Sequence, residues 1–156
     1  MAIGDDIALF ERVPTLALLG RQALRILAIG AETRYLHDGA VLFYAGDPAD
    51  AGYIVQEGSF RLEPADAADD RDEIAAGPGT LLGELALLAE TVRPATATAR
   101  EPSTVIRISR SLFLKMLEGY PGAAKKLRDT MATRVDQWTR ELDNVRSALN
   151  PPHERR

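Results

Sequence analysis

Leu81–Ala99, with the sequence LLGELALLAETVRPATATA, is the most informative stretch of the chain. Gly83 precedes Glu84 and a short apolar turn over residues 85–88, and Arg93 follows after four more residues. A helix that begins just after a glycine directs its first backbone N–H groups toward an anion. The planar guanidinium of Arg93 suits phosphate oxygens, and the carboxylate of Glu84 suits free hydroxyl groups. These residue types in this order predict a site for a phosphorylated sugar.

Short apolar runs separated by turn residues surround this stretch on both sides. Their alternation with Gly, Pro and Asp predicts many short strands, which is typical of a β-barrel or jelly roll. The expected strands are Thr33–Leu36, Val41–Tyr44, Tyr53–Gln56, Ser59–Glu63, Glu73–Ala76, Ala95–Ala99 and Thr104–Ile108. The acidic segment Pro64–Asp72 lacks the spacing and the terminal Glu of a calcium loop, so we interpret it as a polar turn.

Helical patterns flank the strands. Residues 5–30 carry apolar side chains at helical spacing, and Pro14 separates a short first helix from a longer one. A second short helix is predicted over Ser111–Glu118, and Pro121 suits the first turn of a long last helix. Apolar residues on that helix form a stripe that resembles a coiled-coil seam: Leu127, Met131, Val135, Trp138, Leu142, Val145 and Leu149. The stripe predicts a homodimer through residues 127–149.

One domain of ordinary size accounts for the length of 156 residues. The expected fold class is mainly β with flanking helices. The expected parts are N-terminal helices over 5–30, a β-roll over 33–109 and C-terminal helices over 111–149, within a domain over 1–150 that is followed by a tail over 151–156.

Composition excludes several classes of protein. Lys and Arg number 19 against 23 Asp and Glu, a net charge of −4, which gives no electrostatic case for DNA or other nucleic acid. Cysteine is absent, and the two histidines, His37 and His153, are far apart, which argues against a metal centre and a cupin-like metalloenzyme. No Ser-His-Asp arrangement or P-loop is found, so no catalytic residues and no enzyme activity are expected.

No apolar run approaches the ~20 residues of a membrane helix, and residues 1–10 lack a basic leader, so we expect a cytoplasmic protein without a membrane partner.

The run Gly83-Glu84-Leu85-Ala86-Leu87-Leu88, followed by Arg93 and Ala95-Thr96, resembles the phosphate-binding cassette of the cyclic-nucleotide-binding domain family. This is the family of the sensor domains of catabolite activator protein and of protein kinase A regulatory subunits. VLFYAGDPAD at 41–50 and YIVQEG at 53–58 are similar to the family's second strand and the strand after it. The resemblance extends over about residues 7–145 of the chain.

The resemblance implies an eight-stranded, jelly-roll-like β-roll with N-terminal helices, a short cassette helix and two C-terminal helices. It also implies that Glu84 accepts a hydrogen bond from the ribose 2′-hydroxyl and that Arg93 pairs with the exocyclic oxygens of the cyclic phosphate. The backbone N–H of Ala86 would donate to the same phosphate. The remaining residues of the predicted ligand site are Gly83, Leu85, Pro94, Ala95 and Trp138. Trp138 has two open interpretations, a lid over the base or an anchor in a dimer interface.

Pro94 departs from the family, which usually has Ala, Ser or Thr after the arginine. Proline offers neither a backbone N–H nor a hydroxyl to the phosphate. The missing charge-assisted hydrogen bond is worth about 1.5–3 kcal/mol, which is about one to two powers of ten in affinity. The absence of Thr at this position favours cAMP over cGMP as the ligand.

Two functional hypotheses follow from these residues. The first is a cAMP-binding regulatory module in which ligand rearranges the C-terminal helix, with a coupling of about 1–3 kcal/mol to an unknown effector protein. The family's transcription factors add a helix-turn-helix after this helix, and the chain ends at Arg156, so no DNA reader is expected. The alternative is a degenerate, ligand-independent fold used for dimerisation or partner binding, in which Glu84 and Arg93 pair with each other.

Overall fold

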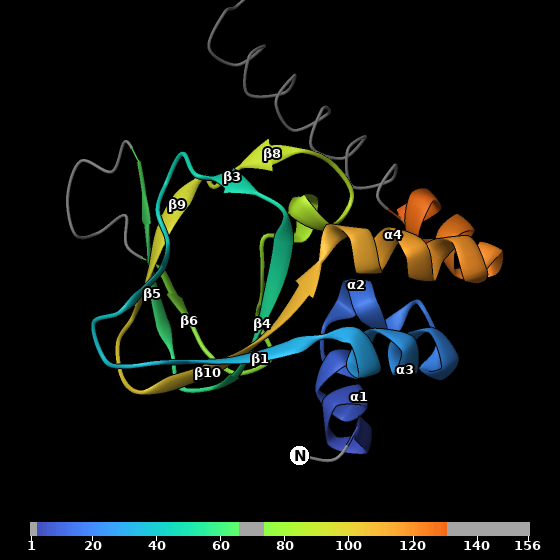
Figure 1. Ribbon diagram of the computed structural model, residues 1–156, viewed down its shortest axis with the longest axis horizontal. Coiled ribbons are helices and arrows are strands. Elements are labelled where there is room, and N and C mark those ends of the chain that lie inside the picture. The colour runs from blue at the N-terminus through green and yellow to red at the C-terminus, as the bar shows by residue number, and fades with distance from the viewer. Residues whose placement is uncertain (1–2, 66–73, 131–156) are drawn as a thin grey trace, which may run out of the picture.

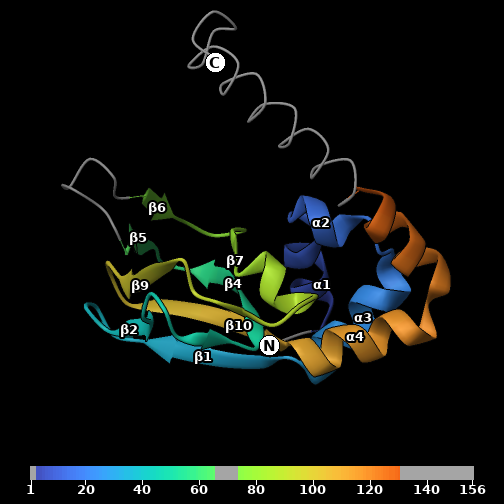
Figure 2. The same cartoon turned by 90° about the horizontal axis from the view of Figure 1, so that it is seen from above.

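A β-roll and a layer of helices lie side by side in the computed structural model, which describes residues 3–65 and 74–130 (Figure 1). The helices gather at one end of the roll, and a view turned by 90° shows the same arrangement (Figure 2). The helices are α1 (Ile3–Glu11), α2 (Pro14–Ala17), α3 (Arg21–Gly30) and α4 (Arg110–Gly119), and residues 121–130 are also helical. Because α3 packs against α4, the two ends of the described chain meet in one helical layer.

The strands of the roll are all paired in antiparallel fashion. They are β1 (Glu32–Leu36), β2 (Val41–Phe43), β3 (Pro48–Ala49), β4 (Ala51–Glu57), β5 (Phe60–Pro64), β6 (Ile74–Ala76), β7 (Leu81–Leu82), β8 (Thr91–Val92), β9 (Ala95–Ala99) and β10 (Ser103–Ser109). The sheets have the orders β1-β10-β4-β7 and β2-β9-β5-β6, and β3 pairs with β8 alone. The expected β-roll with flanking helices is confirmed.

Three strands were not predicted from the sequence. β3, β7 and β8 are only two residues long, so they are too short to show an alternating pattern. Each is defined by its partner: β7 pairs with β4, and β3 pairs with β8. These short pairs matter for function because β7 and β8 lie within Leu81–Ala99, the segment that the sequence singled out, on either side of residues 84–87.

The longer N-terminal helix expected after Pro14 is wrong in one respect, because it is divided at Gly20. This residue has φ +87°, a left-handed value that glycine adopts without strain and that no α-helix contains. α2 therefore ends before Gly20, and α3 begins after it. The C-terminal helices agree with the prediction: α4 is capped by Ser109, whose Oγ accepts a hydrogen bond from the N–H of Leu112 at 3.1 Å, and residues 121–130 are helical from Pro121 onward.

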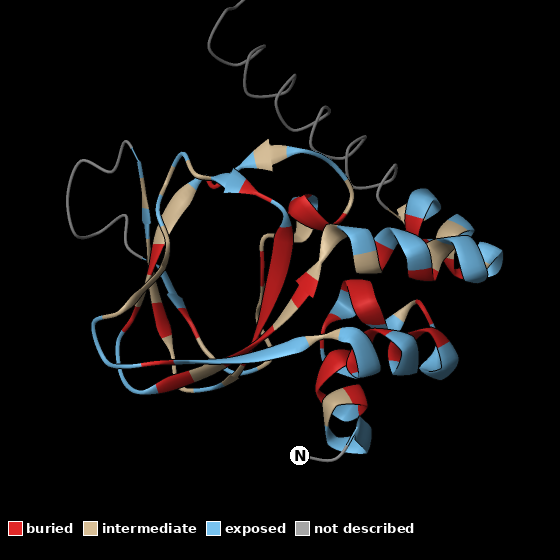
Figure 3. Ribbon diagram, in the orientation of Figure 1, coloured by how far each residue is buried: buried red, intermediate tan, exposed pale blue. Residues whose placement is uncertain are grey.

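Two strands, β4 and β10, are buried on both faces, as the red segments between roll and helices in Figure 3 show. In β4, Tyr53 and Val55 face the apolar interior of the roll, and Ile54 faces the helices. In β10, Val105 faces the roll and Ile106 faces the helices. These strands separate two cores, which we call the roll core and the helical core.

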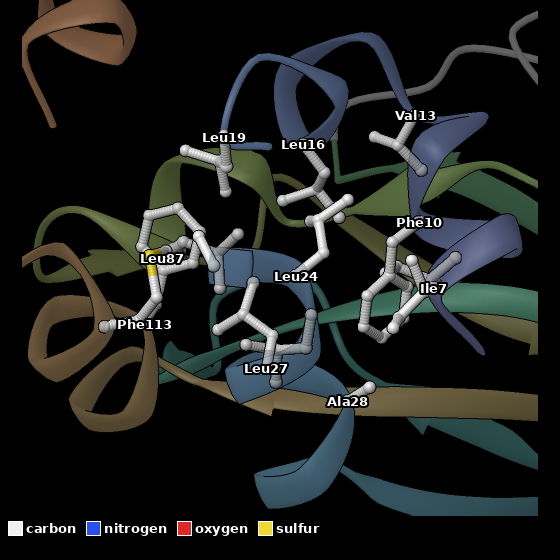
Figure 4. Packing of buried hydrophobic residues seen from close by; sticks show 14 of the residues in the cluster. Ile7, Phe10, Val13, Leu16, Leu19, Leu24, Leu27, Ala28, Leu87 and Phe113 are labelled. Atoms are coloured by element: carbon white, nitrogen blue, oxygen red, sulfur yellow. The ribbon is translucent and has the colours of Figure 1, made fainter. Parts of the chain in front are cut away.

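The helical core gathers side chains from every helix, from β4 and β10, and from the short helix after β7. In the view of Figure 4, Leu87, which comes from the short helix after β7, lies on the same side of this core as Phe113, and Leu16 and Leu24 lie between them and Phe10. Leu127, the first residue of the expected dimer stripe, is also buried in this core, with 2% of its surface exposed. The rest of the stripe, Trp138, His153 and most of the acidic turn lie outside the described residues.

Candidate functional site

A cavity of about 410 Å³ opens between the roll and the short helix that follows β7. Seven of the eight residues predicted for the ligand site line it: Gly83, Glu84, Leu85, Ala86, Arg93, Pro94 and Ala95. Apolar side chains such as Phe43, Leu62 and Val92 line other parts of the wall. The eighth predicted residue, Trp138, lies outside the described residues. The structure therefore brings together every predicted residue that it describes.

Arg93 enters this cavity from a fixed backbone position directly after β8. Its N–H donates to the carbonyl of Asp47 at 2.8 Å, and its carbonyl accepts from the N–H of Gly46 at 2.7 Å. The side chain points inward, so the residue is only 4% exposed. One guanidinium nitrogen, Nη2, donates to the carbonyl of Ala51 on β4 at 2.8 Å. Backbone and side chain are thus both anchored to the roll.

Two aromatic rings contact the guanidinium of Arg93. Its Cζ lies 4.3 Å from the centroid of the Phe43 ring and 5.5 Å from that of Tyr53. A cation held over an aromatic face is attracted by the negative charge of the ring face, more strongly where water is excluded. These two aromatic partners were not predicted from the sequence, because nothing in the spacing of β2 and β4 indicates which ring meets Arg93.

The other guanidinium nitrogens of Arg93, Nε and Nη1, are buried without a hydrogen-bond partner among the described residues. Burial lowers the pKa of Arg93, since it disfavours the charged form, although Tyr53 acts in the opposite direction. An arginine nevertheless remains cationic at neutral pH. No ion pair between Arg93 and Glu84 is formed in the described part of the chain. A buried cation with unused donors is suited to an anionic ligand.

Gly83 leaves room for that guanidinium. It has φ +85°, and a β-carbon added to it would collide with Nη1 of Arg93 and lie 3.2 Å from the carbonyl oxygen of Ala51. The positive φ is one reason for glycine at this position. The structure adds a second reason for glycine, because any side chain at this position would occupy the space of the arginine.

The cassette helix η2 (Glu84–Leu87) is a single 3-10 turn. The N–H of Ala86, which the resemblance assigns to the phosphate, donates to the carbonyl of Gly83 at 3.0 Å in this structure. Leu87 is buried in the helical core, whereas Leu85 is 61% exposed at the edge of the cavity. One short turn therefore contacts the cavity on one side and the helical core on the other.

Glu84 has a partner that sequence analysis did not find. The hydroxyl of Thr15, in α2, donates to Oε2 of Glu84 at 2.7 Å. Thr15 is itself buried, with 3% exposed. The two residues are 69 positions apart in the chain, so no local pattern signals their contact.

Arg110, the first residue of α4, was also missed. Its Nη1 donates to three carbonyl oxygens, those of Ala49 at 2.9 Å, Ala89 at 3.0 Å and Ala86 at 3.3 Å. Two of these carbonyls belong to η2 and the turn after it, where a helix end leaves acceptors without internal partners. Arg110 therefore connects the end of the cassette to the start of α4.

The model of the family described as "Cyclic nucleotide-binding domain" matches residues 33–120. The chain belongs to the cyclic nucleotide-binding domain family. The matched span contains Gly83, Arg93 and the other residues that line the cavity. The family that the Leu81–Ala99 segment resembles is thus the family whose model matches more than half of the chain.

Relatives include proteins with different overall organisation. The chain is 33% identical over 113 residues to the "Cyclic AMP receptor protein" of Thermus thermophilus, a match that covers 72% of this chain and 52% of that protein. It is 34% identical over 141 residues to an "Uncharacterized NTE family protein" of Mycobacterium tuberculosis, covering 90% of this chain and 23% of that protein. The chain therefore spans about half of the first relative and under a quarter of the second.

A solved structure, that of a "Cyclic nucleotide-binding-like protein" from Brucella abortus, matches with a TM-score of 0.63 and 39% identity, covering 73% of this chain and 98% of that one. Together these likenesses make the chain a regulatory binding module of the cyclic nucleotide-binding family. The matches to NTE family proteins cover only part of those proteins and correspond to this binding domain.

Two further features of the described residues concern membranes and metals. None of their helices has the length and apolar character that a bilayer crossing requires. In the same part of the chain, no cluster of three or more His, Asp or Glu side chains is arranged to hold a metal ion.

Proposed function

We propose that the protein is a regulatory module that binds a cyclic nucleotide, cAMP in preference to cGMP, with the cyclic phosphate on Arg93. The observation that carries the proposal is the guanidinium itself. Arg93 is buried at the wall of a cavity of about 410 Å³, and its Nε and Nη1 have no hydrogen-bond partner among the described residues. A phosphodiester supplies both the negative charge and the acceptor oxygens that these two nitrogens need.

Glu84, which also lines the cavity, supports the same ligand. Its carboxylate accepts hydrogen bonds and is suited to the ribose 2′-hydroxyl, which a cyclic 3′,5′-phosphate leaves free. The apolar wall, including Leu62 and Val92, suits the flat face of a purine base. Phosphate, ribose and base then each meet a wall of matching chemistry.

The preference for cAMP rests on position 94. Pro94 has no hydroxyl to donate to a guanine or to the phosphate, and it has no backbone N–H. The N–H of Ala86 is already hydrogen-bonded to Gly83. With fewer backbone donors than the family usually offers, we expect a weaker affinity, about one to two powers of ten below that of a site with the missing donor.

Ligand is proposed to act through the cassette on the helices. η2 carries Leu87 into the helical core, and Arg110 joins the carbonyls of Ala86 and Ala89 to α4. A phosphate that shifts η2 toward Arg93 must therefore shift α4 or break these contacts. We propose that this shift passes to the helix after Pro121, and that residues 1–150 act as one ligand-responsive domain with an effector protein as its partner.

The test is isothermal titration with cAMP and cGMP of the wild type, Arg93→Ala and Arg61→Ala. Arg61 is a matched control, because it is an arginine of β5 whose side chain is 42% exposed and pairs with Glu63 at 2.8 Å. We expect cAMP to bind more tightly than cGMP, Arg93→Ala to weaken binding at least about a hundredfold, and Arg61→Ala to leave it unchanged. Absence of heat with either nucleotide at millimolar concentration would reject the proposal.

That negative result would support the second candidate, a ligand-independent fold used for assembly. Pro94 and the engaged N–H of Ala86 favour it, since both remove donors from the phosphate site. Homodimerisation through residues 127–149 stays a prediction in either case. Light scattering of the chain with and without cAMP measures it, and an assembly that does not respond to nucleotide would favour the second candidate.

A further inference from the structure

The carboxylate of Glu84 is hydrogen-bonded to a residue of the N-terminal helices. Thr15 Oγ1 lies 2.7 Å from Glu84 Oε2, and Thr15 sits in α2 between the buried residues Val13 and Leu16. With 3% of Thr15 exposed, its hydroxyl is held in place by the packing of the helical core. The donor is therefore fixed, and the flexible partner is the longer glutamate side chain.

The chemistry of this pair leaves room for a ligand. A threonine hydroxyl has one proton, and here it points at one oxygen of the carboxylate. An ionised carboxylate has two oxygens and about four acceptor sites, so accepting from Thr15 does not exhaust it. Glu84 lines the cavity while this bond is made. The hydroxyl of Thr15 thus restricts the orientation of the carboxylate without removing it from the cavity wall.

We propose that Thr15 is a positioning residue for the ribose of the ligand: it orients Glu84 so that the carboxylate meets the 2′-hydroxyl in a preset direction. The inference rests on the proposed function and extends it, because it makes α2 part of the nucleotide site. An unheld glutamate must give up its rotational freedom on binding, and a held one has already done so. Thr15 therefore strengthens binding only through the 2′-hydroxyl.

The experiment compares cAMP with 2′-deoxy-cAMP, which lacks the hydroxyl that Glu84 would accept from. Both are titrated into the wild type, Thr15→Val and Thr15→Ser. Valine keeps the shape of threonine and loses the hydroxyl, whereas serine keeps the hydroxyl. We expect Thr15→Val to weaken cAMP binding about three- to tenfold and to change 2′-deoxy-cAMP binding less than about twofold. Thr15→Ser should retain most of the cAMP affinity.

A second comparison tests whether Thr15 acts through Glu84. In Glu84→Ala, the added change Thr15→Val should leave cAMP affinity unaltered, since the carboxylate that it orients is gone. Thr15→Ala replaces the valine variant if the latter does not fold, as judged by its melting temperature.

Each other outcome overturns the inference. Equal weakening of cAMP and 2′-deoxy-cAMP by Thr15→Val would show a general structural effect. Tighter binding of cAMP by the variant would show that Thr15 competes with the ribose for Glu84. If the wild type binds neither nucleotide, the proposed function fails and the role of Thr15 fails with it. If the wild type binds cAMP and the variants do not distinguish the two ligands, only the role of Thr15 fails.

Discussion

Gly83 and Arg93 share a space that admits only one side chain. A β-carbon on Gly83 would overlap Nη1 of Arg93, although the two residues are in separate segments on either side of η2. The glycine backbone and the guanidinium together form one wall of the cavity. The position of the cation therefore depends on the absence of a side chain ten residues earlier.

Gly83→Ala should displace the guanidinium and reduce both stability and ligand affinity. The change adds backbone strain at φ +85° and a collision with Arg93, so we expect a loss of about 2–4 kcal/mol in the free energy of unfolding and at least about tenfold in cAMP affinity. Urea unfolding and calorimetric titration measure the two effects.

Gly39→Ala is the matched control for this substitution. Gly39 also has φ +85°, but a β-carbon there would meet nothing within 4 Å. It should lose about 1–2 kcal/mol from strain alone and keep its cAMP affinity. Equal effects of the two substitutions on affinity would contradict the wall formed by Gly83 and Arg93.

Arg93→Met should separate stability from binding. The wild-type guanidinium is buried with two nitrogens unpartnered among the described residues, so an apolar side chain of similar length removes a desolvation penalty. We expect the unliganded variant to be more stable by about 1–2 kcal/mol while its cAMP binding is lost.

Arg107→Met is the control, because Arg107 contacts Asp50 at 3.4 Å, and the stability of this variant should fall or stay unchanged. A clear loss of stability in Arg93→Met would mean that its bonds to Ala51 and the aromatic rings outweigh the penalty.

Pro94→Ala should strengthen ligand binding by restoring a backbone N–H next to Arg93. One charge-assisted hydrogen bond to the phosphate predicts a gain of about tenfold or more in cAMP affinity. Pro102→Ala, an exposed proline between β9 and β10, serves as the control and should leave affinity unchanged. An unchanged affinity in Pro94→Ala would indicate that the ligand does not approach position 94.

Asp6→Asn should make the protein more stable at neutral pH and have no such effect in acid. Burial raises the pKa of Asp6 above its ordinary value of 3.8, with the nearby Asp5 acting in the same direction, and Oδ1 is buried without a partner among the described residues. A carboxyl whose pKa is raised by folding favours its protonated form in the native state. Protonated Asp6 therefore contributes fully to the free energy of unfolding below pH 3.8. This contribution is lost as the pH rises through the native pKa, because the buried carboxyl then becomes charged.

The pH dependence of urea unfolding checks this expectation. The stability gained in Asp6→Asn should grow between acid and neutral pH. Asp5→Asn, in the same first turn of α1, controls for the loss of a negative charge near a helix N-terminus. If both variants show the same profile, the effect belongs to the helix end and not to the burial of Asp6.

The part of the site that lies in one continuous segment was predictable from sequence. Gly83, Glu84 and Arg93 line one cavity because η2 and β8 return the chain to the same place within a few residues. The strands of four or more residues were also predicted, since each shows apolar residues bounded by turn residues. Local spacing was therefore sufficient to predict the cassette and most strands of the roll.

The partners of the cassette were not predictable in this way. Thr15 and Arg110 reach it from α2 and α4, and their positions depend on how the helical layer packs against the roll. Phe43 reaches it from β2, whose position depends on its pairing with β9. The break at Gly20 was missed for a related reason, because a glycine within an apolar helical pattern is compatible with either a continuous helix or a turn. Tertiary contacts decide such cases, and a single sequence does not display them.

Tyr53 and Ile54 are consecutive residues of β4 whose side chains lie on opposite faces of the strand. Tyr53 lies beside the guanidinium of Arg93, and Ile54 packs among the helices. Insertion of a single residue into this strand would exchange the two sides, placing a phenol among leucines and an isoleucine beside a cation. The strand therefore tolerates changes of side chain far better than changes of length, and engineering of this domain should leave its register untouched.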